Sequence, residues 1–251
     1  MSPSGKHRDP TSSPTPAAPT RSSAGRRCLL PLLPLLLCLL PGCAQLDAFR
    51  QSNVASYEPS NVHRAEPFLP AQMKRVAVLP VTTLTDGSIM EFGRDSLGPV
   101  LLHELGRARL FELVAVSPED LLAMTGRAEW SGDEQLPADF FEKLKEKLGV
   151  DAVLFSRLTQ YRAYEPLSVG WRLKLLDAEE PRVVWAVDEV FDARVPEVVA
   201  GARRFARHHR ESAAAPAEPD DILSSPRRFG QYAASALVAT LPGRAAGASP
   251  P

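Results

Sequence analysis

The chain has 251 residues and a formal net charge of −1, with 29 basic and 30 acidic side chains. This balance excludes the strongly basic domain that nucleic-acid binding requires, so no nucleic-acid partner is expected. The length predicts one folded domain with extensions rather than two domains.

The N-terminus is typical of an export signal. Residues 1–24 are rich in Ser, Pro, Thr and Ala, a composition that does not bury a core. Arg26 and Arg27 then precede an apolar run from Cys28 to Leu40. A basic segment followed by about 7–15 apolar residues defines a secretory signal. The run is shorter than the roughly 20 residues that a membrane-spanning helix needs.

The apolar run ends in Leu40-Pro41-Gly42-Cys43, which resembles the bacterial lipobox, where the chain is cleaved before the cysteine and the cysteine is acylated. We therefore expect residues 1–42 to be a lipoprotein signal peptide and Cys43 to carry the membrane anchor. The alternative is an ordinary signal peptide followed by an incidental cysteine. Cysteine use favours acylation, because Cys43 would be the only cysteine left after cleavage, which rules out an intramolecular disulfide.

The residue after Cys43 is Ala44 rather than Asp, which resembles the sorting signal for the outer membrane. The expected location is therefore the outer membrane, with the protein lipid-anchored and facing the periplasm. Acyl chains such as palmitate contribute about 0.8 kcal/mol per buried methylene, so several chains anchor a protein firmly. Residues 43–73 are expected to be a flexible tether, because recurring Asn, Ser and Pro disfavour regular structure there.

The first predicted strand is the apolar run 76–79, which is rich in valine and is followed by Pro80. A continuous run of this kind indicates a strand buried on both faces, and Pro80, which lacks an N–H, ends it. A helix with one apolar face is expected between residues 89 and 108. Pro99 leaves two alternatives: a long helix that bends at Pro99, or a helix that begins with Pro99.

The elements that follow alternate between strands and helices. Residues 111–116 predict a second strand. Ser117 as N-cap and Pro118 at the first position predict a short helix, and Pro137 opens the next. The remaining elements are strands at 150–161, 169–175 and 183–187, a helix from about 196 and a last helix over 226–241.

This order predicts an α/β fold, as a single three-layer domain over residues 74–241 with a mixed five-stranded sheet flanked by helices. The first three strands alternate with helices and should be parallel, with right-handed crossovers. The last three should form an antiparallel meander. Trp171 and Trp185 fall on inward positions, so we expect them in the core. Residues 242–251 are expected to be a disordered tail.

The stretches that build this sheet resemble a known pattern. They are Arg75–Pro80 (RVAVLP), Leu110–Val114 (LFELV), Leu148–Leu154 (LGVDAVL) and Leu173–Asp177 (LKLLD) with Val184–Ala186 (VWA). Their order behind a lipobox is similar to that of the domain shared by the curli secretion lipoprotein CsgG, the exopolysaccharide lipoprotein PelC, the penicillin-binding-protein activator LpoB and the N-terminal domain of TolB. The resemblance covers residues 74–193.

The resemblance implies a periplasmic lipoprotein that is not an enzyme, uses no cofactor, and either binds an envelope protein partner or assembles as a homo-oligomer. The first function hypothesis is an accessory or structural subunit of a secretion or polymer-assembly system. The alternative is a regulator that binds and activates a periplasmic peptidoglycan synthase.

The sequence shows neither a phosphate-binding loop nor a spaced set of metal ligands. One candidate partner surface is a run of arginines after residue 196, which suits an anionic glycan, a lipid headgroup or an acidic partner. The alternative is an ordinary solvated helix face. The arginines are Arg203, Arg204, Arg207 and Arg210.

A second candidate partner surface is aromatic. Trp130, Tyr161 and Tyr164 lie where loops are expected to gather. Tyrosine and tryptophan offer an apolar body with a polar tip, which suits recognition.

Overall fold

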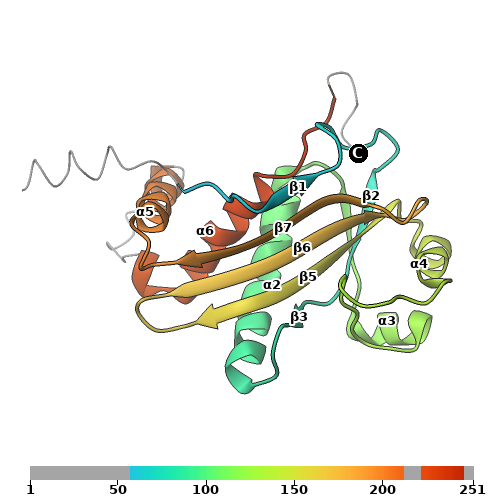
Figure 1. Ribbon diagram of the computed structural model, residues 1–251, viewed down its shortest axis with the longest axis horizontal. Helices are drawn as coiled ribbons and strands as arrows, with labels where there is room; N and C mark the ends of the chain where they lie inside the picture. Colours follow the sequence, from blue (N-terminus) through green and yellow to red (C-terminus); the bar gives the residue numbers. More distant parts are fainter. Residues whose placement is uncertain (1–56, 212–221, 246–251) are drawn as a thin grey trace, which may run out of the picture. The chain divides into compact units, whose positions relative to one another are not determined.

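The computed structural model describes residues 57–211 and 222–245 of the chain. Cys43 and the predicted signal peptide therefore lie outside the described residues. Figure 1 shows the described elements. In chain order these are β1 (Val62–Arg64), β2 (Arg75–Val78), β3 (Thr82–Thr83), α2 (Ser88–Ala108), β4 (Glu112–Ala115), α3 (Pro118–Thr125), α4 (Phe140–Leu148), β5 (Ala152–Arg162), β6 (Ser168–Asp177), β7 (Val183–Asp192), α5 (Pro196–Glu211), the 3-10 helix η1 (Ile222–Ser224) and α6 (Pro226–Val238).

The strands form one mixed sheet in the order β1-β7-β6-β5-β2-β4, with β3 paired to β5. Strand β2 is parallel to both β4 and β5, while β5, β6 and β7 form an antiparallel meander. The predicted α/β class, the parallel half and the meander are confirmed. The sheet has seven strands rather than five, because β1 and β3 add to it.

The two additional strands depend on long partners rather than on their own residues. Thr82 and Thr83 precede a turn-forming sequence, yet they pair with β5 because that eleven-residue strand extends past the end of β2. Strand β1 pairs with β7, placing Val62 opposite Val187 and Arg64 opposite Trp185. A three-residue strand carries too little periodicity to be recognised from its sequence.

The structured domain begins before residue 74, which corrects the prediction of a flexible tether through residue 73. Leu69 and Met73 are buried, at 4% and 0% exposure. The Glu189 carboxylate accepts hydrogen bonds from the backbone N–H groups of Ser60, at 2.7 Å, and Asn61, at 3.4 Å. Burial alone would raise the pKa of Glu189, but these bonds outweigh it and lower that pKa.

The domain also extends past residue 241, so the predicted disordered tail is wrong for residues 242–245. The backbone N–H of Leu69 donates to the carbonyl oxygen of Gly243 at 2.9 Å. The Arg244 guanidinium donates to the carbonyl oxygens of Leu110, at 2.8 Å, and Met73. These hydrogen bonds therefore join the two ends of the domain.

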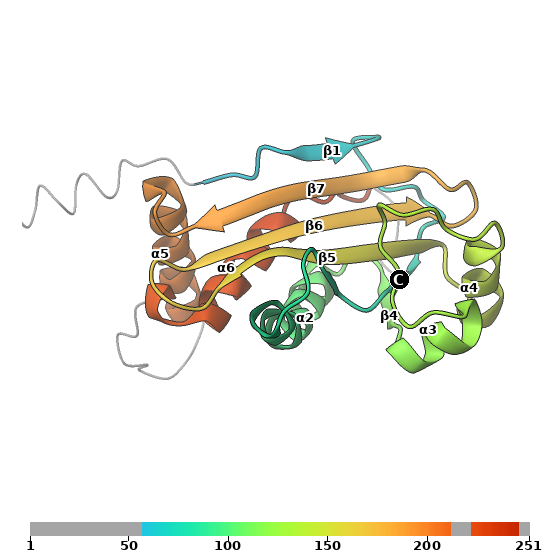
Figure 2. The ribbon, with the colours of Figure 1, turned by 60° about the horizontal axis from the view of Figure 1, so that its bottom comes forward.

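The sheet separates two hydrophobic cores. Val76 and Val78 of β2 face the larger core, while the alternating residue Ala77 faces the smaller one. Helices α2 and α6 cover the larger core, and α5 lies at one end of the meander (Figure 2). Helices α3 and α4 contribute Leu121 and Phe140 to the smaller core.

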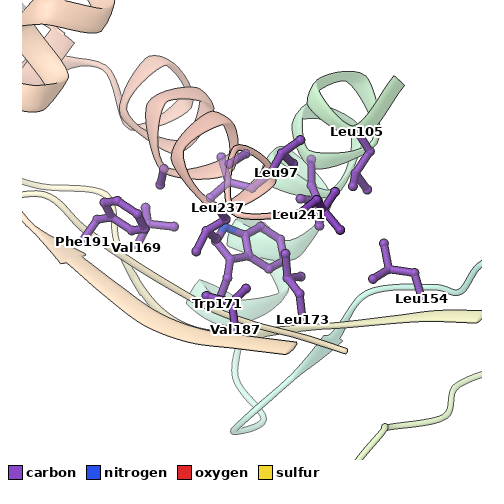
Figure 3. Packing of buried hydrophobic residues seen from close by; sticks show 14 of the residues in the cluster. Leu97, Leu105, Leu154, Val169, Trp171, Leu173, Val187, Phe191, Leu237 and Leu241 are labelled. Carbon is purple, nitrogen blue, oxygen red and sulfur yellow. The ribbon is translucent and has the colours of Figure 1, made fainter. Parts of the chain in front are cut away.

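The larger core contains two tryptophan side chains. Trp171 and Trp185 are fully buried, as predicted. Figure 3 shows Trp171 between the sheet residue Leu173 and the helical residues Leu97 and Leu237. The Trp185 Nε1–H donates to the Thr240 hydroxyl at 3.1 Å, so its polar atom is satisfied.

The first residues of α2, α3 and α4 test the predicted helix starts. Helix α2 runs continuously from Ser88 with Pro99 inside it, which selects the long-helix alternative. The Ser117 hydroxyl accepts from the backbone N–H of Asp120 at 3.0 Å, as expected of an N-cap. Helix α4 begins at Phe140 rather than Pro137, because the residues after Pro137 form a turn first.

Two glycines of α2 give opposite predictions for alanine substitution. A Cβ at Gly93 would lie 2.5 Å from Cγ of Tyr161, a buried ring, whereas a Cβ at Gly106 would lie 3.8 Å from Cδ1 of Leu113, an ordinary van der Waals contact. We expect Gly93→Ala to lower the free energy of unfolding by about 1–2 kcal/mol, since the clash outweighs the gain in helix propensity. Gly106→Ala should raise it by about 0.5–1 kcal/mol, since alanine loses less conformational entropy than glycine in a helix. Urea denaturation would measure both, and equal effects would contradict the packing.

Candidate partner surface

Helix α5 follows β7 and shows two distinct faces. Val198, Ala202 and Ala206 are buried toward the larger core. A spacing of three and four residues along a helix places them on one side. The arginines occupy the other positions of the helix, so the surface they form lies on its outward side.

Aromatic contacts fix α5 against α6. The ring of Phe205 lies 5.9 Å from Tyr232 and 3.9 Å from His209, centre to centre. A Cβ at Gly201 would lie 2.3 Å from the Tyr232 hydroxyl oxygen, so only glycine permits this approach. Burial raises the pKa of Tyr232 to about 12, and the positive charge of Arg204 partly opposes that rise.

The outward side of α5 forms a groove of about 360 Å³. We call this the arginine groove. Its apolar floor comes from Pro196, Val199 and Ala200. Its charged lining is Arg194, Arg203, Arg204 and Arg207.

Three of the four predicted arginines therefore lie on one groove. Arg210 belongs to α5, but its side chain lies outside the described residues. Arg194 was not predicted. It makes a bidentate ion pair with Asp192, with nitrogen–oxygen distances of 2.5 and 3.0 Å. The Arg194 guanidinium lowers the pKa of Asp192, which keeps that carboxylate ionised. The negative charge of Asp192 therefore offsets the positive charge of Arg194.

Trp130 does not form a recognition surface, which corrects the prediction. It is 6% exposed, and its Nε1–H donates to the Thr125 hydroxyl at 2.8 Å. Its ring lies edge-on to Phe140 at 5.5 Å, and the Arg127 guanidinium lies 4.1 Å from the ring centre. The loop that carries Trp130 folds over the smaller core, which an indole fills well.

The two predicted tyrosines differ in exposure, since Tyr161 is buried and Tyr164 is exposed. Tyr161 is 7% exposed, because β5 continues to Arg162 and turns this ring into the larger core. Tyr164 follows the strand and is 82% exposed. The three aromatic residues therefore do not share one surface, and only Tyr164 is available to a partner.

An ion-pair network on the sheet was not predicted. The Asp133 carboxylate forms ion pairs with three cations. They are Nη1 of Arg172 at 2.7 Å, Nη1 of Arg157 at 3.2 Å, and the Lys174 ammonium. Partial burial alone would raise the pKa of Asp133, but the hydrogen bonds from Lys174 and Arg172 outweigh it and lower that pKa. The alternation of charged residues along β5 and β6 signals the cations, but nothing local signals their partner in a loop.

A further surface was missed near the start of α2. Leu84 is 50% exposed, and Ile89 and Phe92 are each 63% exposed. We call these three residues the α2 apolar patch. The Phe92 ring lies 6.3 Å from that of Tyr161, so the patch adjoins the larger core. Ile89 and Phe92 are three residues apart in α2 and so lie on one face of the helix, and Leu84 precedes them in the turn that leads into α2.

Two negative findings concern the described residues only. Among residues 57–211 and 222–245, no group of three or more His, Cys, Asp or Glu side chains is arranged to hold a metal ion. In the same part of the chain, no helix combines the length and apolar character needed to cross a membrane.

Several solved structures are similar to part of this chain. No protein-family model and no curated protein sequence matches the chain. The PelC dodecamer from Paraburkholderia phytofirmans is 16% identical, with 55% of this chain and 86% of that chain covered and a TM-score of 0.36. Lipoprotein GNA1162 from Neisseria meningitidis is also 16% identical, with 55% and 98% covered and a TM-score of 0.34.

The C-terminal domain of LpoB from Escherichia coli is 13% identical, with 56% of this chain and 91% of that chain covered and a TM-score of 0.31. TolB from Acinetobacter baumannii is 12% identical, with 61% and 31% covered and a TM-score of 0.27. The solved structures similar to this chain thus include PelC, LpoB and TolB, the proteins that the sequence resembles. At these scores the likeness assigns no function.

The Asp133 network predicts a pH-dependent contribution to stability. The pKa of Asp133 is lowered in the folded protein, so its contribution is present above the unfolded pKa of about 4 and lost as the pH falls through the folded pKa. Asp133→Asn should lower the Tm by about 2–4 °C at pH 7. The difference should shrink toward pH 2.

A matched control is Asp139→Asn, because within the described chain Asp139 has a single ion-pair partner, the exposed Lys143, at 2.8 Å. It should change the Tm by less than about 1 °C. Thermal unfolding followed by circular dichroism would measure both variants. A Tm difference for Asp133→Asn that is the same at pH 7 and pH 2 would contradict the ionic origin of the effect.

Proposed function

We propose that this protein is a non-enzymatic lipoprotein of the cell envelope, anchored in the outer membrane through acylated Cys43, with its α/β domain in the periplasm. The lipobox-like sequence Leu40–Cys43 supports the anchor. Tyr57 and the residues after it are tied to the sheet, so a short stretch joins the anchor to the domain.

Within the envelope we propose the role of an accessory or structural subunit of a secretion or polymer-assembly system. The α2 apolar patch is the observation that carries this role. Its three side chains are at least half exposed, although burying each one would be favourable by about 1–2 kcal/mol. A patch of this kind is typical of a protein–protein contact.

The anchor predicts the fate of a single substitution. Cys43→Ala should abolish incorporation of labelled palmitate, because no thiol remains at the processed N-terminus. The matched control is the double variant Cys28→Ala/Cys38→Ala, whose substitutions fall in the segment that cleavage removes. It should incorporate palmitate as the unaltered protein does. Palmitate labelling of Cys43→Ala, or its absence from the control, would contradict the anchor.

The subunit role predicts a complex that depends on the α2 apolar patch. Light scattering of the detergent-extracted protein should give a mass of several chains, or of a chain with its partner, rather than one chain. Ile89→Asp/Phe92→Asp should return the mass to that of one chain, since it places charge in the contact. Leu122→Asp, at a side chain that is 51% exposed on α3, should leave the complex intact.

A monomeric unaltered protein would contradict the structural-subunit role. It would favour the alternative, an activator that binds a periplasmic peptidoglycan synthase. Capture of such a synthase by the unaltered protein, but not by Ile89→Asp/Phe92→Asp, would then establish the alternative.

A further inference from the structure

The described chain begins at the α5 end of the domain. The Tyr57 ring lies 5.3 Å from that of Phe191, the residue before the last residue of β7. Figure 1 and Figure 2 both show the first described residues beside α5. The Glu189 carboxylate holds Tyr57 and Ser60 by hydrogen bonds, so this arrangement is built into the domain.

The proposed anchor is close to this point along the chain. Fourteen chain steps separate Cys43 from Tyr57, a reach of at most about 50 Å and, for a flexible coil, an average of about 20 Å. Strand β6, with ten residues, is itself about 33 Å long. The α5 end is therefore the part of the domain tethered nearest the membrane, while α3 and α4 lie at the other end.

The arginine groove suits a phosphate-bearing surface. Arg203, Arg204 and Arg207 follow one another at helical spacing along the outward side of α5. Guanidinium groups bind phosphate through paired N–H donors and stay charged at any physiological pH. Val195, which directly precedes α5, is only 37% exposed, and the charged lining of the groove favours an ionic contact over insertion into the acyl chains.

We propose that the arginine groove binds the anionic phospholipid headgroups of the membrane that holds the anchor, so that the domain docks with its α5 end on the leaflet. This inference rests on the lipid anchor of the proposed function. The position of the groove favours lipid headgroups over an acidic protein as its ligand, because the groove is beside the point where the tether joins the domain. Stable membrane binding commonly combines an acyl chain with a basic surface.

The test uses the acylated full-length protein in vesicles of phosphatidylcholine alone, or with 30% phosphatidylglycerol. A fluorophore on Val195→Cys reports approach to the leaflet through quenching by a nitroxide on the lipid headgroup. We expect quenching to be about threefold stronger in the vesicles with phosphatidylglycerol, and to fall to the neutral-vesicle level in 0.5 M salt. A fluorophore on Leu122→Cys, on α3, should show little quenching in either.

Matched variants separate the arginines from general charge. Arg203→Gln/Arg204→Gln/Arg207→Gln should abolish the extra quenching at residue 195. Lys143→Gln/Lys145→Gln/Lys147→Gln removes three positive charges from α4, at the other end of the domain, and should retain it. Circular dichroism would confirm that both variants are folded.

The outcomes distinguish this inference from the function on which it rests. Flotation with both kinds of vesicle, without stronger quenching at residue 195 on anionic lipid, leaves the anchor standing and overturns the docking. Quenching that the arginine variant retains also overturns it. Failure to float with either vesicle overturns the anchor, and the docking with it.

Discussion

One face of the β5–β6–β7 meander must be covered, and this constraint organises the domain. The three strands are ten or eleven residues long, and their alternating residues place Trp171, Leu173 and Val187 on a continuous apolar face. Helices α2 and α6 cover that face. Their close approach depends on Gly230, where a Cβ would lie 2.4 Å from Leu97. Large buried surfaces of this kind supply most of a domain's stability.

Covering that face determines where the candidate surfaces lie. Since α2 and α6 occupy the apolar face, α5 packs at the end of the meander, with one side on Tyr232 and the other outward. The opposite face of the meander contributes Val153 and Phe155 to the smaller core, and beyond them it carries charge, where Asp133 pairs with Arg157, Arg172 and Lys174. The arginine groove and the charged sheet are thus consequences of the same packing.

Local patterns predicted the parts of the fold that carry their own signal. The buried strands, the Ser117 cap and the arginine-rich helix each show in a few consecutive residues. Strand β1 does not, because Val62 is its only apolar residue and it exists through its pairing with β7. The hydrogen bonds of Arg244 could not be predicted for the same reason, because they go to carbonyl oxygens that are distant in the sequence.

In the candidate partner surfaces, too, local sequence patterns predicted some residues correctly and tertiary packing decided the others. A cluster of arginines is visible in the sequence because helical spacing alone brings Arg203, Arg204 and Arg207 together. Trp130 was misassigned because its loop composition signals exposure, whereas the smaller core needed an aromatic side chain. The α2 apolar patch was not predicted because an exposed apolar residue cannot be told from a buried one by its identity alone.

The pairing of β1 with β7 has a mechanical consequence. Under the proposed anchoring, a pulling force on the N-terminal side of the domain would pass first through the three residues of β1 and the hydrogen bonds to Glu189. These are few and lie at the sheet edge, so they yield before the meander does. Release of residues 57–68 would lengthen the chain before the domain by about 40 Å and leave the buried Leu69 and Met73 in place. Under the proposed anchoring, strand β1 would therefore separate from β7 under a pulling force before the meander unfolds.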